Sequence, residues 1–179
     1  MQRARHIRNI ALIGFMGVGK TTVGHALAET LGFEFLDTDA VIETRCGKTI
    51  TDIFAHEGEA TFRELEKKLV AEFATREKLI ISCGGGLAAN QANLDALKIF
   101  SLVVCLWASP EKILTRVRHQ AHRPLLHDPD PLAKIKSLLA AREPFYRQAD
   151  VMVNTELRSI KAVAQQVAHQ FRLDHGGGK

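Results

Sequence analysis

A glycine-rich segment near the amino terminus carries the strongest chemical signal in the sequence. Residues 14–21 read Gly-Phe-Met-Gly-Val-Gly-Lys-Thr, which fits the GxxxxGK[ST] phosphate-binding loop. Glycines let backbone N–H groups converge on phosphate oxygens, the lysine can reach the β- and γ-phosphates, and the threonine hydroxyl can bind Mg²⁺. The segment therefore predicts nucleoside-triphosphate binding, by Gly17, Val18, Gly19, Lys20, Thr21 and Thr22.

A phosphate loop needs a strand before it and a helix after it, and the sequence supplies both. Residues 7–13 form an apolar run typical of a buried strand, and residues 20–31 place Val23, Leu27 and Leu31 at helical spacing. The amino terminus of such a helix attracts phosphate through its dipole and unpaired amides. This context favours a functional loop over a glycine-rich structural turn.

Two aspartates follow the second predicted strand, residues 33–36. Asp37 and Asp39 are expected at the carboxyl edge of the sheet, where open α/β sheets bind ligands. One carboxylate can lie near a metal while the other accepts the proton of a hydroxyl nucleophile. The alternative is that one aspartate caps a helix and the other faces solvent. The third strand, 79–83, ends without a carboxylate and no NKxD motif is present, so a guanine-specific switch GTPase is disfavoured.

The remaining pattern alternates apolar strands with amphipathic helices. Further strands are expected at 100–107 and 151–153, and helices at 60–75, from Pro110, over 131–142 with a break near Pro144, and over 159–171. Strands that are apolar on both faces and separated by helices indicate a parallel sheet covered on both sides. We expect one domain over residues 1–179, with a polar lid at about 117–129 and a disordered tail at about 174–179.

Composition excludes several classes of protein. The 179 residues carry 24 Lys+Arg and 20 Asp+Glu, and this charge of +4 is spread along the chain, which disfavours a nucleic-acid binder. No apolar run approaches the length of a membrane span, about 18–20 residues. The amino terminus does not resemble a signal peptide, and the three cysteines form no CxxC pair, so we expect a cytoplasmic protein with reduced thiols.

Six motifs in order along the chain resemble the shikimate kinase family. They are Gly14–Thr22, Leu36–Asp39, Phe62-Arg63 with Glu66, Gly84–Gly86, Arg123–Leu126 and Ala141–Tyr146. The phosphate loop alone is shared by many kinases, but the set includes acceptor-side motifs as well. The resemblance spans residues 7 to about 170 and implies a three-layer P-loop kinase fold, with a central five-stranded parallel sheet, a helical substrate-binding segment at about 38–66 and a lid.

The resemblance also implies an activity and a role for each motif. It implies transfer of phosphate from ATP, with Mg²⁺, to the 3-hydroxyl of shikimate by a monomeric enzyme. Arg63 and Arg142 would hold the acceptor carboxylate, where a guanidinium offers paired donors. Asp39 would bind hydroxyls and orient or deprotonate the attacking one, and Arg123 would neutralise charge on the transferred group. The other assigned residues are Gly84, Gly85 and Gly86 for the acceptor, Lys20 for catalysis, and Thr21 and Asp37 for the metal.

Alternatives stay open at several positions. Arg63 could simply pair with Glu64 or Glu66, and Arg142 could cover apolar surface with its stem. Arg116, Arg118 and Arg158 are ambiguous nucleotide contacts. A metal site at His119, His122 and His127 is disfavoured because no fourth ligand accompanies them. For the whole chain, the alternatives are a gluconate or nucleotide kinase of the same fold, or a regulatory module that binds nucleotide without catalysis.

Overall fold

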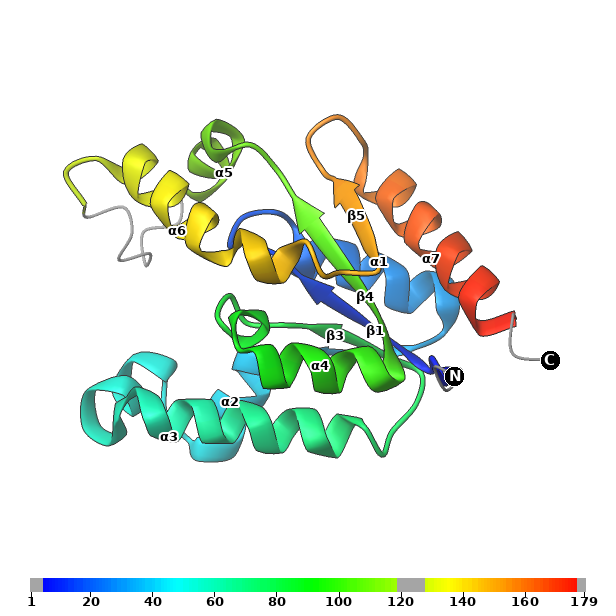
Figure 1. The fold of residues 1–179 in the computed structure, drawn as a ribbon, viewed down its shortest axis with the longest axis horizontal. Coiled ribbons are helices and arrows are strands. Elements are labelled where there is room, and N and C mark those ends of the chain that lie inside the picture. Colours follow the sequence, from blue (N-terminus) through cyan, green and yellow to red (C-terminus); the bar gives the residue numbers. More distant parts are fainter. Residues whose placement is uncertain (1–4, 119–127, 177–179) are drawn as a thin grey trace.

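The protein is built around a five-stranded parallel sheet. The computed structural model describes residues 5–118 and 128–176. The strands are β1 (Asn9–Ile13), β2 (Glu34–Asp37), β3 (Leu79–Ser82), β4 (Ser101–Trp107) and β5 (Val151–Asn154). They lie in the order β2-β3-β1-β4-β5, and every pair is parallel. The carboxyl ends of β1, β2 and β3 therefore lie together at one edge of the sheet (Figure 1).

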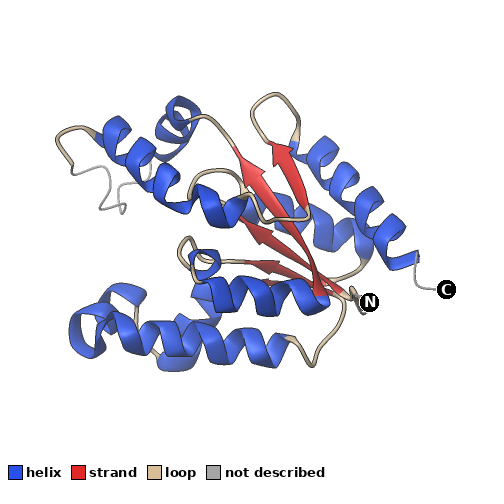
Figure 2. Ribbon diagram, viewed as in Figure 1, coloured by secondary structure: helices blue, strands red, loops and turns tan. Residues whose placement is uncertain are grey.

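Within the described residues, seven α-helices and one 3-10 turn connect and cover the strands. They are α1 (Lys20–Leu31), α2 (Thr38–Cys46), α3 (Ile50–Phe73), η1 (Leu87–Ala89), α4 (Gln91–Phe100), α5 (Pro110–Val117), α6 (Pro131–Tyr146) and α7 (Ile160–Gly176). Figure 2 shows α1 and α7 on one side of the sheet and α3 and α4 on the other. The predicted three-layer fold with a five-stranded parallel sheet is confirmed.

Each face of the sheet buries its own apolar cluster. Alternate residues of β1 divide between the two faces: Ile10 and Leu12 pack with α1 and α7, while Ala11 and Ile13 pack with α3 and α4. β1 is completely buried on both faces because it is the central strand of a sheet covered by helices. Among the described residues, no helix is long and apolar enough to cross a membrane.

Several boundaries differ from the sequence prediction. The predicted helix 60–75 is the second half of α3, which begins at Ile50 and is interrupted at Gly58, where φ is 83°. α6 continues through Pro144 to Tyr146 instead of ending near residue 142. α7 continues beyond Phe171, where the predicted helix ended, and includes residues 174–176, which were assigned to a disordered tail. Residues 177–179 and most of the predicted lid, 119–127, lie outside the described residues.

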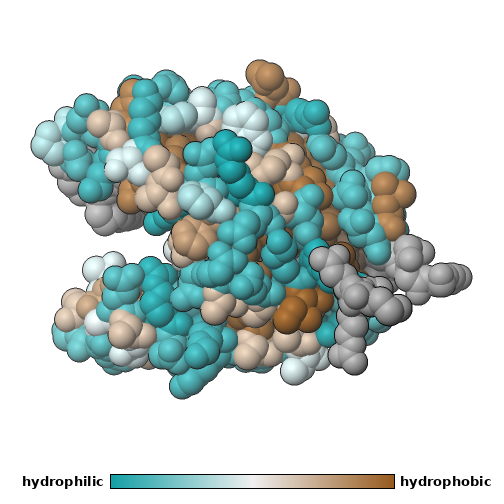
Figure 3. All heavy atoms as spheres, viewed as in Figure 1, coloured by the Kyte–Doolittle hydropathy of each residue, from teal (hydrophilic) through white to brown (hydrophobic). Residues whose placement is uncertain are grey.

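The molecule is hollowed on one side by a notch. Figure 3 shows this notch between the part that contains α5 and α6 and the part that contains α3. The predicted substrate-binding segment, residues 38–66, comprises α2 and α3 from Ile50 to Glu66, including the interruption at Gly58. This segment therefore faces α6 across the notch.

Candidate active site

The phosphate loop joins β1 to α1 as predicted. Gly19 caps α1 in the left-handed region, with φ of 100°, and no side chain caps the helix, whose first turn also lacks an acidic residue. The amides of that first turn are thus left for an anion. The Lys20 ammonium donates hydrogen bonds to the carbonyl oxygens of Gly14, at 2.9 Å, and Phe15, at 3.0 Å, which hold the lysine across the loop.

A cavity of about 560 Å³ opens above this loop. Its walls combine the phosphate loop, the ends of β2 and β3, and residues from the α5 and β5–α7 region. The lining residues are Met16 to Val23, Asp37, Asp39, Ser82 to Gly85, Arg116, Thr155, Arg158, Ile160 and Val163. The cavity therefore brings together every predicted nucleotide-loop residue with both predicted aspartates. Arg63, Gly86 and Arg142 are not among the residues that line it.

Asp37 caps α2 with its side chain. One of its carboxylate oxygens accepts hydrogen bonds from the backbone N–H of Asp39, at 3.1 Å, and of Ala40, at 3.3 Å. The other oxygen accepts from the Ser82 hydroxyl at 3.0 Å. The alternative in which one aspartate is a helix cap is thus true of Asp37. Because Asp37 also lines the cavity with Thr21, the cap does not remove it from the site.

Asp39 is the predicted proton acceptor, and it is half-buried in the wall of the cavity, not fully exposed to solvent as the capping alternative would require. Its pKa is raised from 3.8 to about 6, mainly by burial and then by repulsion from Asp37, while Lys20 lowers it. At neutral pH the Asp39 carboxylate is therefore mostly ionised, because the pH is about one unit above its pKa. A carboxylate with a pKa this close to the working pH is an effective base.

Three successive glycines face three different functional side chains. A Cβ at Gly84 would lie 2.1 Å from an Asp39 carboxylate oxygen, and one at Gly86 would lie 2.8 Å from Arg63 Nη1. A Cβ at Gly85 would come within 3.4 Å of Arg142 Nη1. Only glycine permits this close approach at positions 84 and 86. The turn is tied to α2 because the Gly84 N–H donates to the Thr38 hydroxyl at 2.8 Å.

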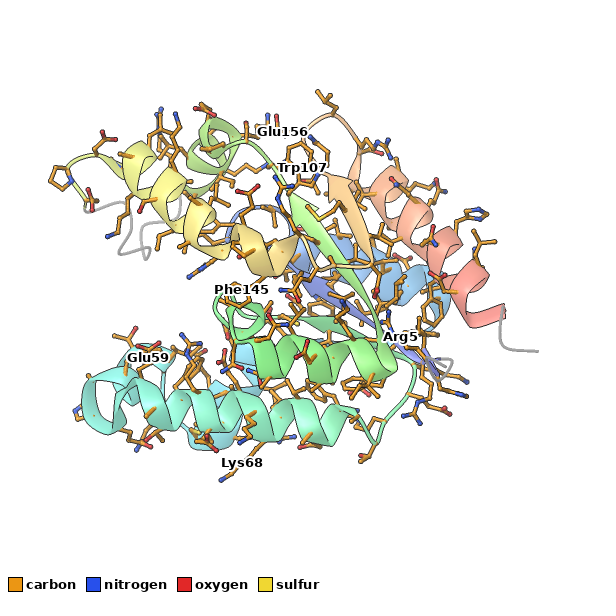
Figure 4. The ribbon with its side chains drawn as sticks, viewed as in Figure 1. Arg5, Glu59, Lys68, Trp107, Phe145 and Glu156 are labelled. Atoms are coloured by element: carbon orange, nitrogen blue, oxygen red, sulfur yellow. The ribbon has the colours of Figure 1, made fainter. Side chains whose placement is uncertain are left out.

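Arg63 is held between two carboxylates on α3. Its Nη1 donates to Glu66 at 2.8 Å, and its Nη2 donates to Glu59 at 2.8 Å. Glu66 is buried, which raises its pKa, and the guanidinium opposes that shift. Of the two predicted alternatives for pairing, Glu66 is therefore correct and Glu64 is not. Figure 4 shows Glu59 on the side of α3 that faces α6, so the two pairs hold the guanidinium between this side of the helix and the buried Glu66.

Arg142 points inward from α6, as its place on the apolar stripe predicted. Its guanidinium carbon lies 5.3 Å from the centre of the Phe15 ring, a cation–π contact. Its Nη1 is buried and has no hydrogen-bond partner. The alternative, in which the head of this arginine reaches solvent, does not hold for Nη1. A buried N–H donor that has no partner, and that lies next to a glycine without a side chain to fill the space, is typical of an anion-binding site.

The far end of the cavity is organised by Arg116 and Thr155. Arg116 donates to the Thr155 hydroxyl at 3.0 Å and to the Thr155 carbonyl at 2.6 Å, and the Thr155 hydroxyl is 2.9 Å from the Val18 carbonyl. These bonds join α5, the β5–α7 loop and the phosphate loop. Arg158 also lines the cavity, and it donates to Gln166 on α7. Arg118 is exposed, and Arg123 lies outside the described residues.

Comparison with known proteins identifies the family to which the chain belongs. The model of the family "Shikimate kinase" matches residues 16–172. The chain belongs to the shikimate kinase family. The protein named "Shikimate kinase" in Symbiobacterium thermophilum is 44% identical over 167 residues, which cover 92% of this chain and 96% of that protein.

Solved structures separate the shikimate kinase family from other kinases of the same fold. The structure titled "Shikimate kinase from Acinetobacter baumannii in complex with shikimate" has a TM-score of 0.85 and 38% identity, and the match covers 97% of this chain and 96% of that one. A gluconokinase from Sinorhizobium meliloti has a TM-score of 0.62 at 18% identity, over 96% of each chain, and shows likeness of fold alone.

Some residues of this family member's site were missed from the sequence. Glu59, Ser82 and Thr155 each hold a functional group in place, but a single carboxylate or hydroxyl carries no motif. For Ser82, its place at the end of a strand next to that of Asp37 was the available signal. The metal site at His119, His122 and His127, which the sequence disfavoured, falls outside the described residues. Within the described residues, no group of three side chains that could hold a metal ion occurs.

Proposed function

We propose that the protein transfers the γ-phosphoryl group of ATP to the 3-hydroxyl of shikimate. The observation that carries this proposal is the arrangement of Asp39, Arg142 and Arg63 around one glycine turn beside a phosphate loop. Shikimate presents a carboxylate at one end of its ring and hydroxyls at the other. The two arginines suit the carboxylate, and Asp39, between them and the cavity, suits the hydroxyls.

The nucleotide is assigned to the cavity lined by the phosphate loop. Amides of Gly17, Val18 and Gly19 and of the first turn of α1 would bind the phosphates, together with Lys20 and the hydroxyls of Thr21 and Thr22. Arg116 and Arg158 line the cavity beyond the loop, where the base and ribose would lie.

Thr21 and Asp37 fit a Mg²⁺ site. Magnesium is held in such sites by one or two protein oxygens, with phosphate oxygens and water completing an octahedron. Thr21 offers a hydroxyl, and the Asp37 carboxylate keeps lone pairs beyond its three hydrogen bonds. When bound, the ion would screen the phosphate charge during transfer.

The chain's own residues then account for the transfer. Asp39 orients the acceptor hydroxyl and accepts its proton as the new bond to phosphorus forms. Lys20 stabilises the charge that moves onto the leaving oxygen and the transferred group. Arg123, assigned from its sequence motif alone, adds a second cation there. Because every residue comes from one chain, a monomer is sufficient for the reaction.

A coupled assay of ADP release tests the proposed function. ATP·Mg²⁺ is supplied with shikimate, gluconate or a nucleoside monophosphate in parallel. We expect turnover with shikimate and background rates with the other two acceptors. Turnover on gluconate or a nucleotide without turnover on shikimate contradicts the proposal, and ATP binding without turnover on any acceptor points to a regulatory module.

A further inference from the structure

Two buried polar atoms on α6 lack hydrogen-bond partners. They are Nη1 of Arg142 and the hydroxyl oxygen of Tyr146. Residues four apart in a helix lie on the same face, so Tyr146 follows Arg142 by one turn and points toward the same neighbours. Buried polar atoms are rarely left unpaired, and two neighbouring ones at the acceptor end of a site indicate groups that complete their hydrogen bonds when a ligand binds.

Tyr146 is placed to act on Arg142 and not on the substrate directly. Its side chain is 6% exposed and its ring packs in the apolar cluster that contains Leu87 and Cys105. Arg142 and the Tyr146 hydroxyl are close neighbours: the guanidinium lowers the phenol pKa through its charge and through hydrogen bonding, against the larger effect of burial, which raises it. No hydrogen bond of ordinary geometry yet joins the Tyr146 hydroxyl to a partner. The phenol therefore lies behind the guanidinium, on the core side of the site.

The two acceptor-side arginines differ in how they are held. Arg63 forms ion pairs with Glu59 and Glu66. Arg142 forms no ion pair with any residue in the described ranges, and its guanidinium lies over the face of the Phe15 ring. A cation–π contact holds a guanidinium above an aromatic ring. The guanidinium can still rotate within its own plane. A neutral hydroxyl can stop this rotation without neutralising the charge that the substrate needs.

We propose that Tyr146 is a positioning residue for the acceptor carboxylate: its hydroxyl accepts a hydrogen bond from Arg142 when the carboxylate binds, and fixes the plane of the guanidinium. The carboxylate then meets two N–H groups in the correct orientation for a bidentate contact. This contact is made equally before and during phosphoryl transfer. Tyr146 therefore contributes to the binding of shikimate and not to the chemical step. The inference rests on the proposed role of Arg142.

The test is Tyr146→Phe, which keeps the ring and removes the hydroxyl. We expect the KM for shikimate to rise about fivefold to tenfold, the effect of one ordinary hydrogen bond, with kcat and the KM for ATP within about twofold. The denaturant midpoint of the ligand-free protein stays level or rises, because the lost hydroxyl had no partner. Ser101→Ala is the matched control: Ser101 also has a buried, unpartnered hydroxyl, but lies at the opposite end of β4.

A double-mutant cycle with Arg142→Lys separates the possible outcomes. If Tyr146 acts through the guanidinium, Tyr146→Phe changes the KM for shikimate less than about twofold in the Arg142→Lys background. An unchanged KM in the single variant, an equal rise in both backgrounds, or a lowered midpoint with loss of kcat each overturns the proposal. If Arg142→Lys itself leaves this KM unchanged, the acceptor role of Arg142 fails, and the role of Tyr146 fails with it.

Discussion

Replacing Gly84 by alanine tests the geometry of the catalytic carboxylate directly. A Cβ at this position would lie 2.1 Å from one Asp39 carboxylate oxygen and 2.8 Å from the carboxylate carbon, and its three nearest atoms all belong to Asp39. Ordinary contact begins at 3.4 Å, so the Asp39 side chain must move by more than 1 Å. The backbone at Gly84 is not in the left-handed region, so alanine fits the chain itself.

The size of the effect follows from that displacement. Moving a catalytic group by about 1 Å from its productive position can lower the rate about 100-fold. We therefore expect Gly84→Ala to reduce kcat by about 100-fold in the coupled assay of ADP release. ATP affinity, measured with a fluorescent nucleotide, should stay unchanged, because the phosphate loop is not among the nearest atoms to the new Cβ.

Gly85→Ala is the matched control for this substitution. Its Cβ would meet only Arg142 Nη1, at 3.4 Å, which is ordinary contact. We expect kcat to remain within about threefold of the unmodified protein, since no catalytic group is displaced. A Gly84→Ala variant with normal kcat would refute the placement of Asp39 at the reacting hydroxyl. Equal losses in both variants would show that the glycine turn, not Asp39, is what the substitution disturbs.

Three further predictions follow from the same site. Because the pKa of Asp39 is raised to about 6, and the protonated group cannot accept a proton, kcat/KM for shikimate should fall about tenfold per unit below about pH 6; a profile flat to about pH 5 contradicts its role as base. Arg142→Lys should raise the KM for shikimate about tenfold and change kcat less than about threefold, because it keeps the charge but loses the paired donors; the reverse pattern would place Arg142 in the chemical step. Asp37→Asn should keep the cap of α2, so the unfolding free energy, measured by urea titration, changes by less than about 0.5 kcal/mol. The Mg²⁺ concentration for half-maximal rate should rise severalfold in that variant, and an unchanged requirement would remove Asp37 from the metal site.

The helices next to the phosphate loop and the sheet strands were predictable because their signals are local. Helix α1 was predicted with its observed bounds, since it follows the last glycine of the phosphate loop, its apolar residues from Val23 to Leu31 have helical spacing, and Gly32 stops the helix. Helix α4 was missed because it ends at Phe100 and β4 begins at Ser101, so no turn residue separates two apolar segments. Helix α2 has only two buried residues, Thr38 and Ile42, and therefore little periodicity to detect.

For the proposed site, the sequence suggested candidate residues but not their contacts. Motif positions identified Asp39, Arg63 and Arg142, which lie far apart in sequence, and only the packing of α6 and α3 around the glycine turn shows which glycine faces which side chain. The pair between Arg63 and Glu59 is a local contact between residues four apart on α3, but only the structure shows that Arg63 uses it together with Glu66. Tyr146 could not be assigned a role from sequence, because a tyrosine on an apolar stripe is indistinguishable from a core residue.

The position of the phosphate on the product is the most direct test of the central claim. Purified protein is incubated with ATP, Mg²⁺ and shikimate, and the product is examined by phosphorus and proton nuclear magnetic resonance. We expect a single phosphorylated product in which the phosphorus couples to the proton on the carbon that bears the 3-hydroxyl. Free phosphate without a shikimate ester, or an ester at another hydroxyl, would contradict it.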